Sequence, residues 1–541
     1  MRSMTDEQSA SRGEDVERDG RIIELHYSLG ELPSSQHRAG LAGLVLLIRW
    51  LRRQRGARRG MYEITRLDAY GLTLRLSKVG LAMIFDAAYS AFTENRAYPF
   101  RFEEREPSEV QFIEDASGVT AGKTLYIYPA RVPKGAFLVE WDRSADGLWI
   151  KLWRDAVFSI FRSGGTPRLP YVARTDRRHA PTPARDVERT WCSLTAGDEA
   201  VKISSTDLLG GRSLSEDGIP FMDRPRFQFL LNFWPFVGQI YVPRIVDRHG
   251  TISSVGYVVA IPDVADLEIF CDELEHALTN RTPEENKRVG CRPGGAIVDL
   301  GVEGGLDFFV RMKRQVSLRE GQRATSDLVL GVDVFHMERR KNRVFTRGIG
   351  RVDPDDTLID AYARVRGLLW STPFRRQRIV NLIDQKPWHD GFDRLIVRSS
   401  EELTLGCERF RHDARIMFEN EVSNMQHPND LSSLSQLVLR FVGAYVRGRL
   451  ESKYGMTYAE AKKRSEIDKY RFLRRKVARD AFLAVRGRTG EEFSEYFVAT
   501  LGSVRQHIKE PEFEMISEAL FDEARRAQVR TITLLALCAR G

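Results

Sequence analysis

The chain has 541 residues, of which 42% are hydrophobic and 29% charged, and this composition excludes a disordered or a fibrous protein. Its 83 Lys and Arg slightly exceed its 75 Asp and Glu, so the formal net charge is +8. Lys accounts for 15 of the basic residues and Arg for the other 68. A GC-rich coding sequence explains most of that excess, although guanidinium groups also bind phosphate in a bidentate manner.

Hydropathy and cysteine usage predict a reduced cytoplasmic protein that is not embedded in a membrane. The longest apolar run, residues 39–48, is about half of the roughly 20 residues that span a bilayer. Residues 1–20 are polar and acidic, and we predict a disordered tail there. The cysteines lie too far apart in the sequence for a zinc knuckle or an evident disulfide framework. They are Cys192, Cys271, Cys291, Cys407 and Cys538.

The first predicted elements are a strand over 21–29 and a helix that ends near Gln54. A serine of the stretch 33–35 is a suitable N-cap for this helix, and its apolar middle predicts burial on all sides. Alternating apolar and polar residues then predict strands within 62–77, with a break at Tyr70–Gly71.

The next segment combines one helix with several strand candidates. Helical spacing predicts a helix over 81–93, and apolar runs predict strands over 124–128, 136–141 and 148–153. Prolines and arginines then fill 164–185, which predicts a loop or an internal linker.

The middle of the chain is expected to supply core strands. Residues 227–241 are dense in aromatic side chains, which are more often buried in a core than free for stacking. A buried strand is predicted over 256–261, and Pro262–Asp263 is predicted to begin a helix. Further strands are predicted over 296–300 and 328–336.

Strand patterns stop after about residue 400, and helical patterns continue to the last residues. Thr457 with Glu460, and Thr489 with Glu492, have the spacing of capping boxes. We therefore predict an α+β fold class, in which an irregular mixed α/β N-terminal lobe precedes a C-terminal all-α helical bundle. The predicted domains are the acidic tail over 1–20, the lobe over 21–400 with a possible linker near 164–185, and the bundle over 401–541.

Catalytic motifs are incomplete in this sequence. Gly118–Lys123 resembles a phosphate-binding loop, but three residues instead of four separate its glycines and a strand is predicted to follow. His389 adjoins Asp390, yet adjacent side chains point in different directions. Glu338 precedes a basic run without the spacing of a nuclease carboxylate-and-lysine motif. We predict no catalytic residue, no metal site and no cofactor.

Positive charge is concentrated in the predicted bundle. Residues 440–488 contain 15 basic and 5 acidic side chains, so this segment carries +10, more than the whole chain. So many like charges on helices favour a polyanion partner. The alternative is a solvated face that pairs with the acidic stretch 510–523.

Two smaller basic clusters lie in the predicted N-terminal lobe. One ends the buried helix over 49–59, and the other is a loop over 339–343 whose side chains have the groups that read base edges. No zinc finger, homeodomain or RRM signature accompanies them. The candidate nucleic-acid-binding residues are Arg52, Arg53, Arg55, Arg58, Arg59, Arg339, Arg340, Lys341, Asn342, Arg343, Lys462, Lys463, Arg464, Arg471, Arg474, Arg475 and Lys476.

Three stretches of the sequence resemble a known family. Leu32–Leu44 (LPSSQHRAGLAGL), Gly256–Pro262 (GYVVAIP) and Lys386–Phe392 (KPWHDGF) are similar to parts of the large subunit of type I CRISPR surveillance complexes (Cascade), in the Myxan branch allied to type I-B. The likeness spans most of residues 22–400. The plan of an irregular α/β lobe followed by a helical bundle is also similar.

The resemblance implies a non-catalytic role in RNA-guided DNA recognition. It implies that the chain recognises the motif flanking the target in duplex DNA, aids R-loop formation and touches the 5′ end of the guide. It also implies that the bundle holds the displaced strand. The implied partners are CRISPR guide RNA, the target DNA duplex and displaced strand, other Cascade subunits, and recruited helicase-nuclease or transposition proteins. The resemblance assigns no motif-reading residue.

The residues leave other functions open. One is a metal-dependent nucleic-acid enzyme, for which Glu338 is a candidate carboxylate. Another is a scaffold that binds nucleic acid by itself or contacts an acidic protein through its basic bundle. An internal start at Met417 or Met425 would also yield a separate product of about 120 residues, long enough for a small helical bundle.

Overall fold

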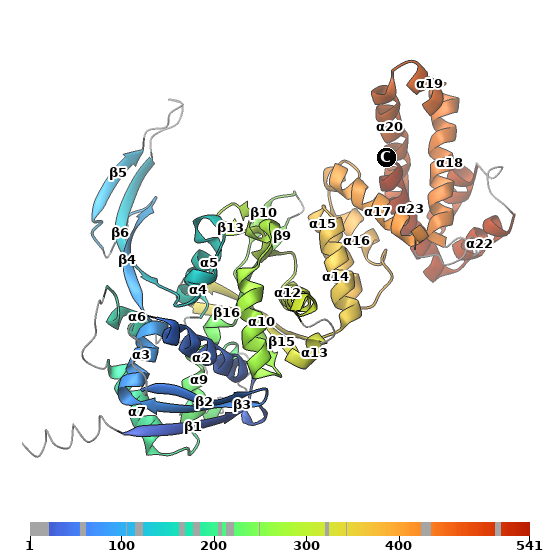
Figure 1. Cartoon of the computed structure of the whole chain (residues 1–541). Helices are drawn as coiled ribbons and strands as arrows, with labels where there is room; N and C mark the ends of the chain where they lie inside the picture. Colours follow the sequence, from blue (N-terminus) through green and yellow to red (C-terminus); the bar gives the residue numbers. More distant parts are fainter. Residues whose placement is uncertain are drawn as a thin grey trace, which may run out of the picture. The chain divides into compact units, whose positions relative to one another are not determined.

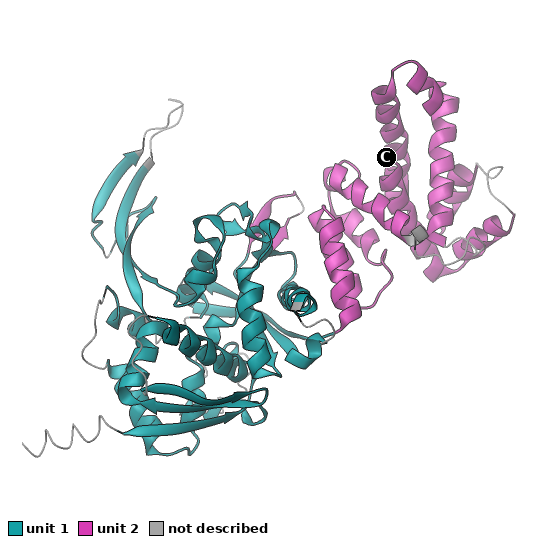
Figure 2. Cartoon of the chain, in the orientation of Figure 1, with its two compact units in different colours: residues 1–243, 255–354 teal, residues 244–254, 355–541 magenta. Residues whose placement is uncertain are grey.

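The computed structural model of the chain contains two compact units (Figure 2). The first unit comprises residues 1–243 and 255–354, and the second comprises 244–254 and 355–541. The predicted tail over 1–20 lies outside the described residues. The structure describes residues 21–54, 61–103, 105–113, 123–161, 168–176, 184–203, 208–211, 221–247, 249–319, 324–341, 343–423, 434–503 and 510–541.

A three-stranded antiparallel sheet with the order β1-β3-β2 begins the first unit (Figure 1). The predicted strand over 21–29 and the strands within 62–77 are confirmed. In the turn between β2 and β3, the Asp68 carboxylate accepts hydrogen bonds from the amides of Tyr70 and Gly71, which fixes the turn. The strands are Ile22–Ser28 (β1), Tyr62–Asp68 (β2) and Gly71–Ser77 (β3).

A second antiparallel sheet, with the order β4-β6-β5, extends away from the rest of the first unit (Figure 1). The rings of Tyr98, Phe102 and Tyr128 pack edge to face on it. The strand predicted over 124–128 is confirmed within β6. The helix predicted over 81–93 ends early, because the residues after it pair with β6 as a strand. These elements are Lys78–Ala88 (α3), Ala91–Tyr98 (β4), Glu109–Ile113 (β5) and Lys123–Pro133 (β6).

Two segments predicted as strands are helices. The segment 136–141 contains α4, and the segment 148–153 begins α5. Leu148, Leu152 and Ala156 recur on one buried face of α5, four residues apart. A run of only six mostly apolar residues fits a buried strand and a buried helix equally well. A longer stretch of sequence is needed to tell the two apart. The helices are Leu138–Trp141 (α4) and Leu148–Ser159 (α5), with the turn Ala145–Gly147 (η2) between them.

Short elements connect these helices to the central sheet. The possible linker over 164–185 contains α6, and its parts 164–167 and 177–183 lie outside the described residues. Within the aromatic segment 227–241, Phe233 is completely buried, as predicted for a core. The elements are Arg168–Ala173 (α6), Arg185–Ala196 (α7), Val201–Ile203 (β7), Phe221–Asp223 (β8), Pro225–Leu230 (α9) and Trp234–Phe236 (η3).

The central sheet of the first unit is antiparallel along β9-β11-β15-β16, and the short β14 runs parallel to β9. The strands predicted over 256–261 and 328–336 are confirmed as β11 and β15, whereas the strand predicted over 296–300 has only two paired residues, in β14. The last residues of β9 pair with β10 as a hairpin of the second unit. The strands are Gln239–Val246 (β9), Ile252–Ser254 (β10), Tyr257–Val264 (β11), Ile297–Val298 (β14), Val329–Arg340 (β15) and Arg343–Val352 (β16).

The helix after β11 begins later than predicted. Pro262 and Asp263 still belong to β11, because they pair with β15. Asp266 is the N-cap of α10, and its carboxylate accepts a hydrogen bond from the amide of Ile269 at 3.0 Å. The elements around the sheet are Leu267–Thr279 (α10), Pro283–Asn286 (α11), Arg288–Val289 (β12), Arg292–Pro293 (β13), Gly294–Ala296 (η4), Glu303–Arg319 (α12) and Thr325–Leu328 (α13).

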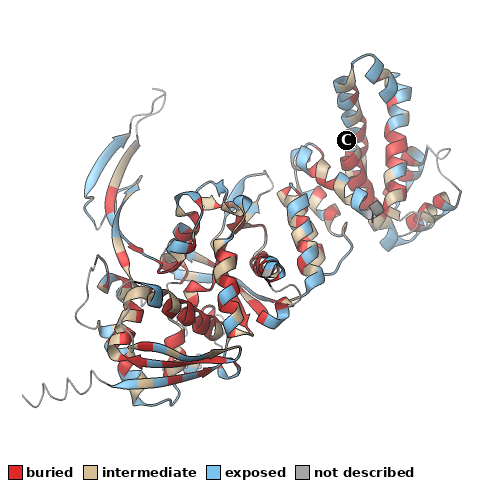
Figure 3. Cartoon of the chain, viewed as in Figure 1, coloured by how far each residue is buried: buried red, intermediate tan, exposed pale blue. Residues whose placement is uncertain are grey.

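Helix α2, Ser35–Arg53, is the buried centre of the first unit (Figure 3). Its apolar middle is buried on all sides, as predicted, and it packs on β11 and beside α9 and η3. A Cβ atom at Gly43 would lie 2.2 Å from the carbonyl oxygen of Phe233, and one at Gly40 would lie 2.3 Å from that of Leu230. The two glycines therefore allow the close approach, and each large apolar side chain buried there contributes about 1.5–3 kcal/mol.

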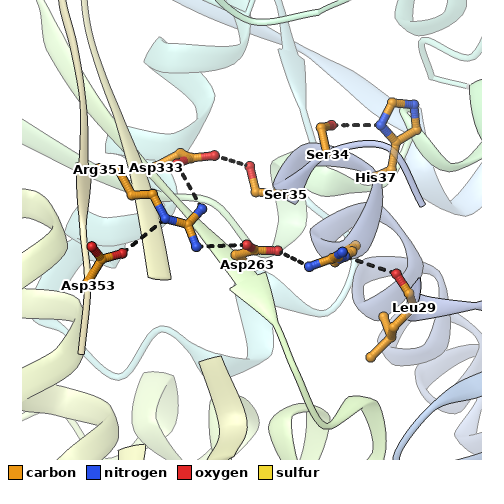
Figure 4. A network of polar contacts seen from close by, with 9 residues as sticks. Leu29, Ser34, Ser35, His37, Asp263, Asp333, Arg351 and Asp353 are labelled. Atoms are coloured by element: carbon orange, nitrogen blue, oxygen red, sulfur yellow. Dashed lines mark hydrogen bonds and ion pairs between the residues drawn. The ribbon is translucent and has the colours of Figure 1, made fainter. Parts of the chain in front are cut away.

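Ion pairs join the start of α2 to the central sheet (Figure 4). The Asp263 carboxylate of β11 lies 2.7 Å from Arg38 and 2.9 Å from Arg351. The Asp333 carboxylate of β15 accepts a hydrogen bond from Ser35 at 2.5 Å and lies 3.4 Å from Arg351. Two carboxylates thus connect α2, β11, β15 and β16.

The imidazole of His37 gives α2 a second attachment at its first turn. Its Nδ1 lies 2.7 Å from Ser34 Oγ (Figure 4), and its Nε2 lies 3.0 Å from a carboxylate oxygen of Asp223. The His37 side chain is only 3% exposed. Both ring nitrogens therefore have partners, which orients the ring and fixes the direction of the helix.

The second unit is built from helices around α23, which packs against α16, α17, α18, α20, α21 and α22 (Figure 1). Residues 529–539 of α23 are buried throughout (Figure 3). A mixed α/β region followed by a helical region is the predicted fold class. The boundary predicted between 400 and 401 stays a prediction. The helices are Asp356–Leu368 (α14), Thr372–Ile383 (α15), Phe392–Arg398 (α16), Glu408–Ser423 (α17), Leu434–Tyr454 (α18), Tyr458–Lys463 (α19), Ile467–Arg486 (α20), Gly490–Tyr496 (α21), Glu510–Phe521 (α22) and Glu523–Arg540 (α23).

One of the two predicted capping boxes forms. Thr457 Oγ1 accepts from the Glu460 amide at 3.3 Å, and the Glu460 carboxylate accepts from the Thr457 amide at 3.0 Å. Thr489 precedes α21 but accepts no capping hydrogen bond from it, so the second box was wrong. Gly490 has a φ of 57°, which turns the backbone out of the helical path directly after Thr489.

We expect Gly43→Ala to destabilise the protein, because the added methyl group would meet the Phe233 carbonyl and force α2 away from its neighbours. Overpacking of this kind costs about 1–3 kcal/mol. Gly367→Ala in α14 is the control, since nothing lies within 4 Å of its added Cβ atom and alanine favours a helix. Urea unfolding of both variants measures the difference, and equal midpoints would contradict this account of α2.

Candidate nucleic-acid interface

The basic end of α2 is largely paired with α10. Arg49 lies 2.5 Å from Asp272, and Arg53 lies 3.2 Å from Glu275. Arg52 is exposed and donates no hydrogen bond within the part of the chain that the structure describes. Of the two described candidates in this cluster, Arg52 therefore has the less paired charge and Arg53 the more paired one. Three of its members lie outside the described residues, namely Arg55, Arg58 and Arg59.

The tip of the β15–β16 hairpin holds the second predicted cluster. Lys341 has a φ of 53°, a left-handed turn conformation, and its side chain is exposed. Arg339 donates to the main-chain oxygens of Lys341 at 2.9 Å and Phe158 at 3.3 Å, which fixes the turn. Among the described residues, the side chains of Lys341 and Arg343 have no acceptor. Asn342 lies outside the described residues.

The carboxylate of Glu338 lies below this tip and is held by two arginines. It lies 3.0 Å from Arg340 and 2.6 Å from Arg347. Hydrogen bonds from Arg340 and then from Arg347 lower the pKa of Glu338. The charge of Arg340 is thus partly balanced. Within the described ranges, no group of three or more His, Cys, Asp or Glu residues is arranged to hold a metal ion.

The third predicted cluster covers the outer face of α19 and α20. Helix α20 buries Val477 and Phe482 and turns its opposite face to solvent. The pair between Arg471 and Asp468 is 3.5 Å long and exposed, so it neutralises little charge. Lys476 has no acceptor among the residues described. The exposed basic residues of this face are Lys462, Lys463, Arg464, Arg471, Arg475 and Lys476.

Arg474 differs from its neighbours because its guanidinium is partly buried. It donates to the main-chain oxygen of Gly541 at 3.1 Å, and its Nε is buried without a partner in the described structure. Burial lowers the pKa of Arg474, and nearby arginines, Arg415 among them, lower it further. Arg540 lies in the same environment. The sequence prediction missed Arg415 and Arg540, because no linear spacing connects residues of α17, α20 and α23.

The first two clusters belong to the first unit and the third to the second. The structure shows exposed charge at some of the predicted positions and pairing at others, and binding of nucleic acid by these residues stays a prediction. No helix within the described ranges is long and apolar enough to cross a bilayer.

Comparison with protein families covers most of the chain. Residues 61–322 match the model of the type I-B CRISPR Cas8b N-terminal domain, and residues 329–540 match that of the type I-B CRISPR Cas8b C-terminal domain. The irregular α/β unit and the helical unit are thus those of a type I CRISPR–Cas protein. The chain belongs to the Cas8b family and is a large subunit of type I-B Cascade. No curated protein matches the chain.

We expect Lys476→Gln to weaken binding of single-stranded DNA and Arg53→Gln to leave it nearly unchanged. Lys476 has no acceptor among the described residues, whereas Arg53 already contacts Glu275. The logarithm of the association constant falls as the logarithm of the salt concentration rises, and loss of one phosphate contact makes this slope shallower by about 0.7 for a single strand. Fluorescence anisotropy at several salt concentrations gives this slope. Equal slopes for the two variants would show that the pairing pattern does not select the contact residues.

Proposed function

We propose that this large subunit recognises the motif flanking the target in duplex DNA, aids R-loop formation and holds the displaced strand. The observation that carries the proposal is the exposed basic face of α19 and α20, together with membership in the Cas8b family. RNA-guided recognition assigns the target sequence to base pairing and leaves the flanking motif to the protein. The partners of this function are the CRISPR guide RNA, the target DNA and other Cascade subunits.

The face of α19 and α20 is suited to a strand without sequence preference. Its cations are exposed, and the described carboxylates leave Lys476 unpaired. Such a face binds a phosphate backbone by releasing counterions, so the affinity falls as salt rises. The exposed ring of Phe472 on the same helix, with a relative exposure of 61%, adds a surface on which a base can stack.

The hairpin tip is suited to duplex DNA. Arg339 fixes the turn through main-chain acceptors, and Lys341 and Arg343 extend from it with no acceptor among the described residues. Ammonium and guanidinium groups bind the phosphates of a duplex and the O6 and N7 atoms of guanine in its major groove. A rigid two-stranded ribbon with free donors at its tip therefore supports contact with the flanking duplex.

The proposed role is non-catalytic, and a recruited helicase-nuclease or transposition machinery would act on the DNA. In the rival role, a metal-dependent nuclease, Glu338 would supply the catalytic carboxylate. That carboxylate is bound by Arg340 and Arg347, which leaves it poorly placed as a metal ligand. This pairing supports the non-catalytic role.

We infer that an internal start would separate the bundle cleanly only at Met425. Met417 lies inside α17, so a product starting there would begin with a fragment of that helix, whereas a product starting at Met425 would lack the whole helix. Met425 lies outside the described residues, after the end of α17. Intact mass spectrometry of the purified complex tests this inference. Full-length chain alone would contradict it, and a fragment starting at Met417 would contradict the choice of Met425.

We expect the double variant Lys341→Glu, Arg343→Glu to weaken duplex binding by the complete complex at least tenfold, because it reverses two charges that lack acceptors among the described residues. Arg143→Glu, Lys151→Glu is the matched control, since both residues are exposed in the same unit. Electrophoretic mobility shift with guide RNA and a motif-bearing duplex gives the affinities.

Two results would contradict the proposed function. One is equal duplex affinity of the hairpin variant and its control. The other is Mg²⁺-dependent strand cleavage by the chain alone that disappears in Glu338→Gln, which would identify the rival nuclease.

A further inference from the structure

Helices α17, α18 and α20 pack with α23 (Figure 1), and each of the four helices carries an arginine of one cluster. Helix α23 contributes Arg540 and α20 contributes Arg474, both partly buried. Helix α17 contributes Arg415 and α18 contributes Arg447, both exposed. We call these four residues the arginine junction. Arg447, Arg474 and Arg415 each lower the pKa of Arg540, and Arg415 also lowers that of Arg474, so the three guanidinium groups lie within electrostatic range of Arg540.

A glycine provides the space for two of these groups. A Cβ atom at Gly443 of α18 would lie 3.3 Å from Arg540 Nε and 3.7 Å from a terminal nitrogen of Arg447. The guanidinium of Arg540 therefore lies directly against the backbone of α18, beside that of Arg447. An added methyl group at this position would touch both groups, and Arg540 would have to move by a few tenths of an ångström.

The arginine junction has more donors than acceptors. The Nε atoms of Arg474 and Arg540 are buried and have no partner in the described structure. Arg474 donates to the main-chain oxygen of Gly541, and the Glu419 carboxylate acts on Arg540. Arg415 and Arg447 donate no hydrogen bond among the described residues. Four cations thus share few acceptors, and an unpaired buried donor costs about 1–3 kcal/mol.

Arginines elsewhere in the same unit show what satisfied pairing looks like. Arg440 of α18 contacts the Glu512 carboxylate of α22, and Arg479 of α20 contacts the Glu401 carboxylate at 2.5 Å. Arg530 donates to two main-chain oxygens. The junction differs because Arg474 and Arg540 each have a buried Nε without a partner among the described residues and lie near other arginines, and such a cluster is stable when an anion with several oxygen acceptors binds it.

We propose that the arginine junction binds one phosphate group. A phosphate offers oxygens in several directions, as required by guanidinium groups that come from four helices, whereas a carboxylate offers two oxygens in one plane. This inference rests on the proposed function, because the junction adjoins the basic face of α20, where Arg471 lowers the pKa of Arg474. The phosphate comes from the backbone of a held strand or from free phosphate in solution.

The test compares Arg540→Met with Arg525→Met in the full chain. Both variants remove one arginine from α23, and Arg525 is exposed about 22 Å away along the helix. The melting temperature is measured in chloride, in inorganic phosphate at equal ionic strength, and with a 20-nucleotide single strand. We expect phosphate or the strand to raise the melting temperature of the wild type and of Arg525→Met by several degrees more than chloride does.

We expect Arg540→Met to lose this extra stabilisation. In low-salt chloride it should melt at or above the wild-type temperature, because repulsion within the junction is relieved. A purely structural role of Arg540 would instead lower its melting temperature in every buffer. Arg447→Met, on an exposed side chain, is the second variant if Arg540→Met does not fold, and it should need severalfold more phosphate for half of the shift.

Each outcome decides the inference. Stabilisation by inorganic phosphate identifies a site for free phosphate, and stabilisation by the strand alone identifies a backbone phosphate. No stabilisation beyond chloride in either case, or equal stabilisation in wild type and Arg540→Met, would overturn it. Duplex binding by the complete complex is measured in parallel. If duplex binding persists while neither inorganic phosphate nor the strand stabilises the chain beyond chloride, the phosphate site at the arginine junction is disproved and the proposed function stands.

Discussion

The first unit depends on arginines that neutralise the charge of two carboxylates placed where α2 meets the central sheet. The Asp263 side chain is only 10% exposed, and it is stabilised by Arg38 from α2 and Arg351 from β16. Removal of one partner from such a pair leaves a poorly solvated charge, at a cost of about 3–5 kcal/mol. The same contacts set where α2 enters the core and where β16 ends, at the base of the β15–β16 hairpin. The core packing and the hairpin position therefore share one electrostatic requirement.

Sequence patterns predicted the fold class and the long elements well. They failed for short elements and for boundaries that tertiary contacts decide. The all-round apolar middle of α2 predicted its burial correctly. The run at 148–153 was ambiguous, because its helical period becomes visible only when Ala156 is included. Pro262 was interpreted as a helix start, yet pairing of β11 with β15 extends the strand past it. Tertiary pairing decided that boundary, and no local signal contains it.

The candidate interface was predicted as charge and not as geometry. Counting arginines found α20 and the hairpin, but it treated Arg53 and Lys476 alike, although of these two only Arg53 has a carboxylate partner among the described residues. Pairing depends on which helices lie side by side, and composition does not record that. For the same reason Arg540 was missed: its neighbours come from α17, α18 and α20, which are far from it in the sequence.

The position of α23 in the bundle has a consequence for how the second unit acquires its structure. The helices that pack around α23 all precede it in the chain, and its buried stretch 529–539 comes last among the elements they contact. During synthesis, α17 to α22 therefore emerge before the helix that covers the part of their apolar faces turned toward α23. Cooperative folding of the bundle has to wait for α23 to leave the ribosome. A chain that loses its final segment exposes those faces and becomes a substrate for chaperones and proteases.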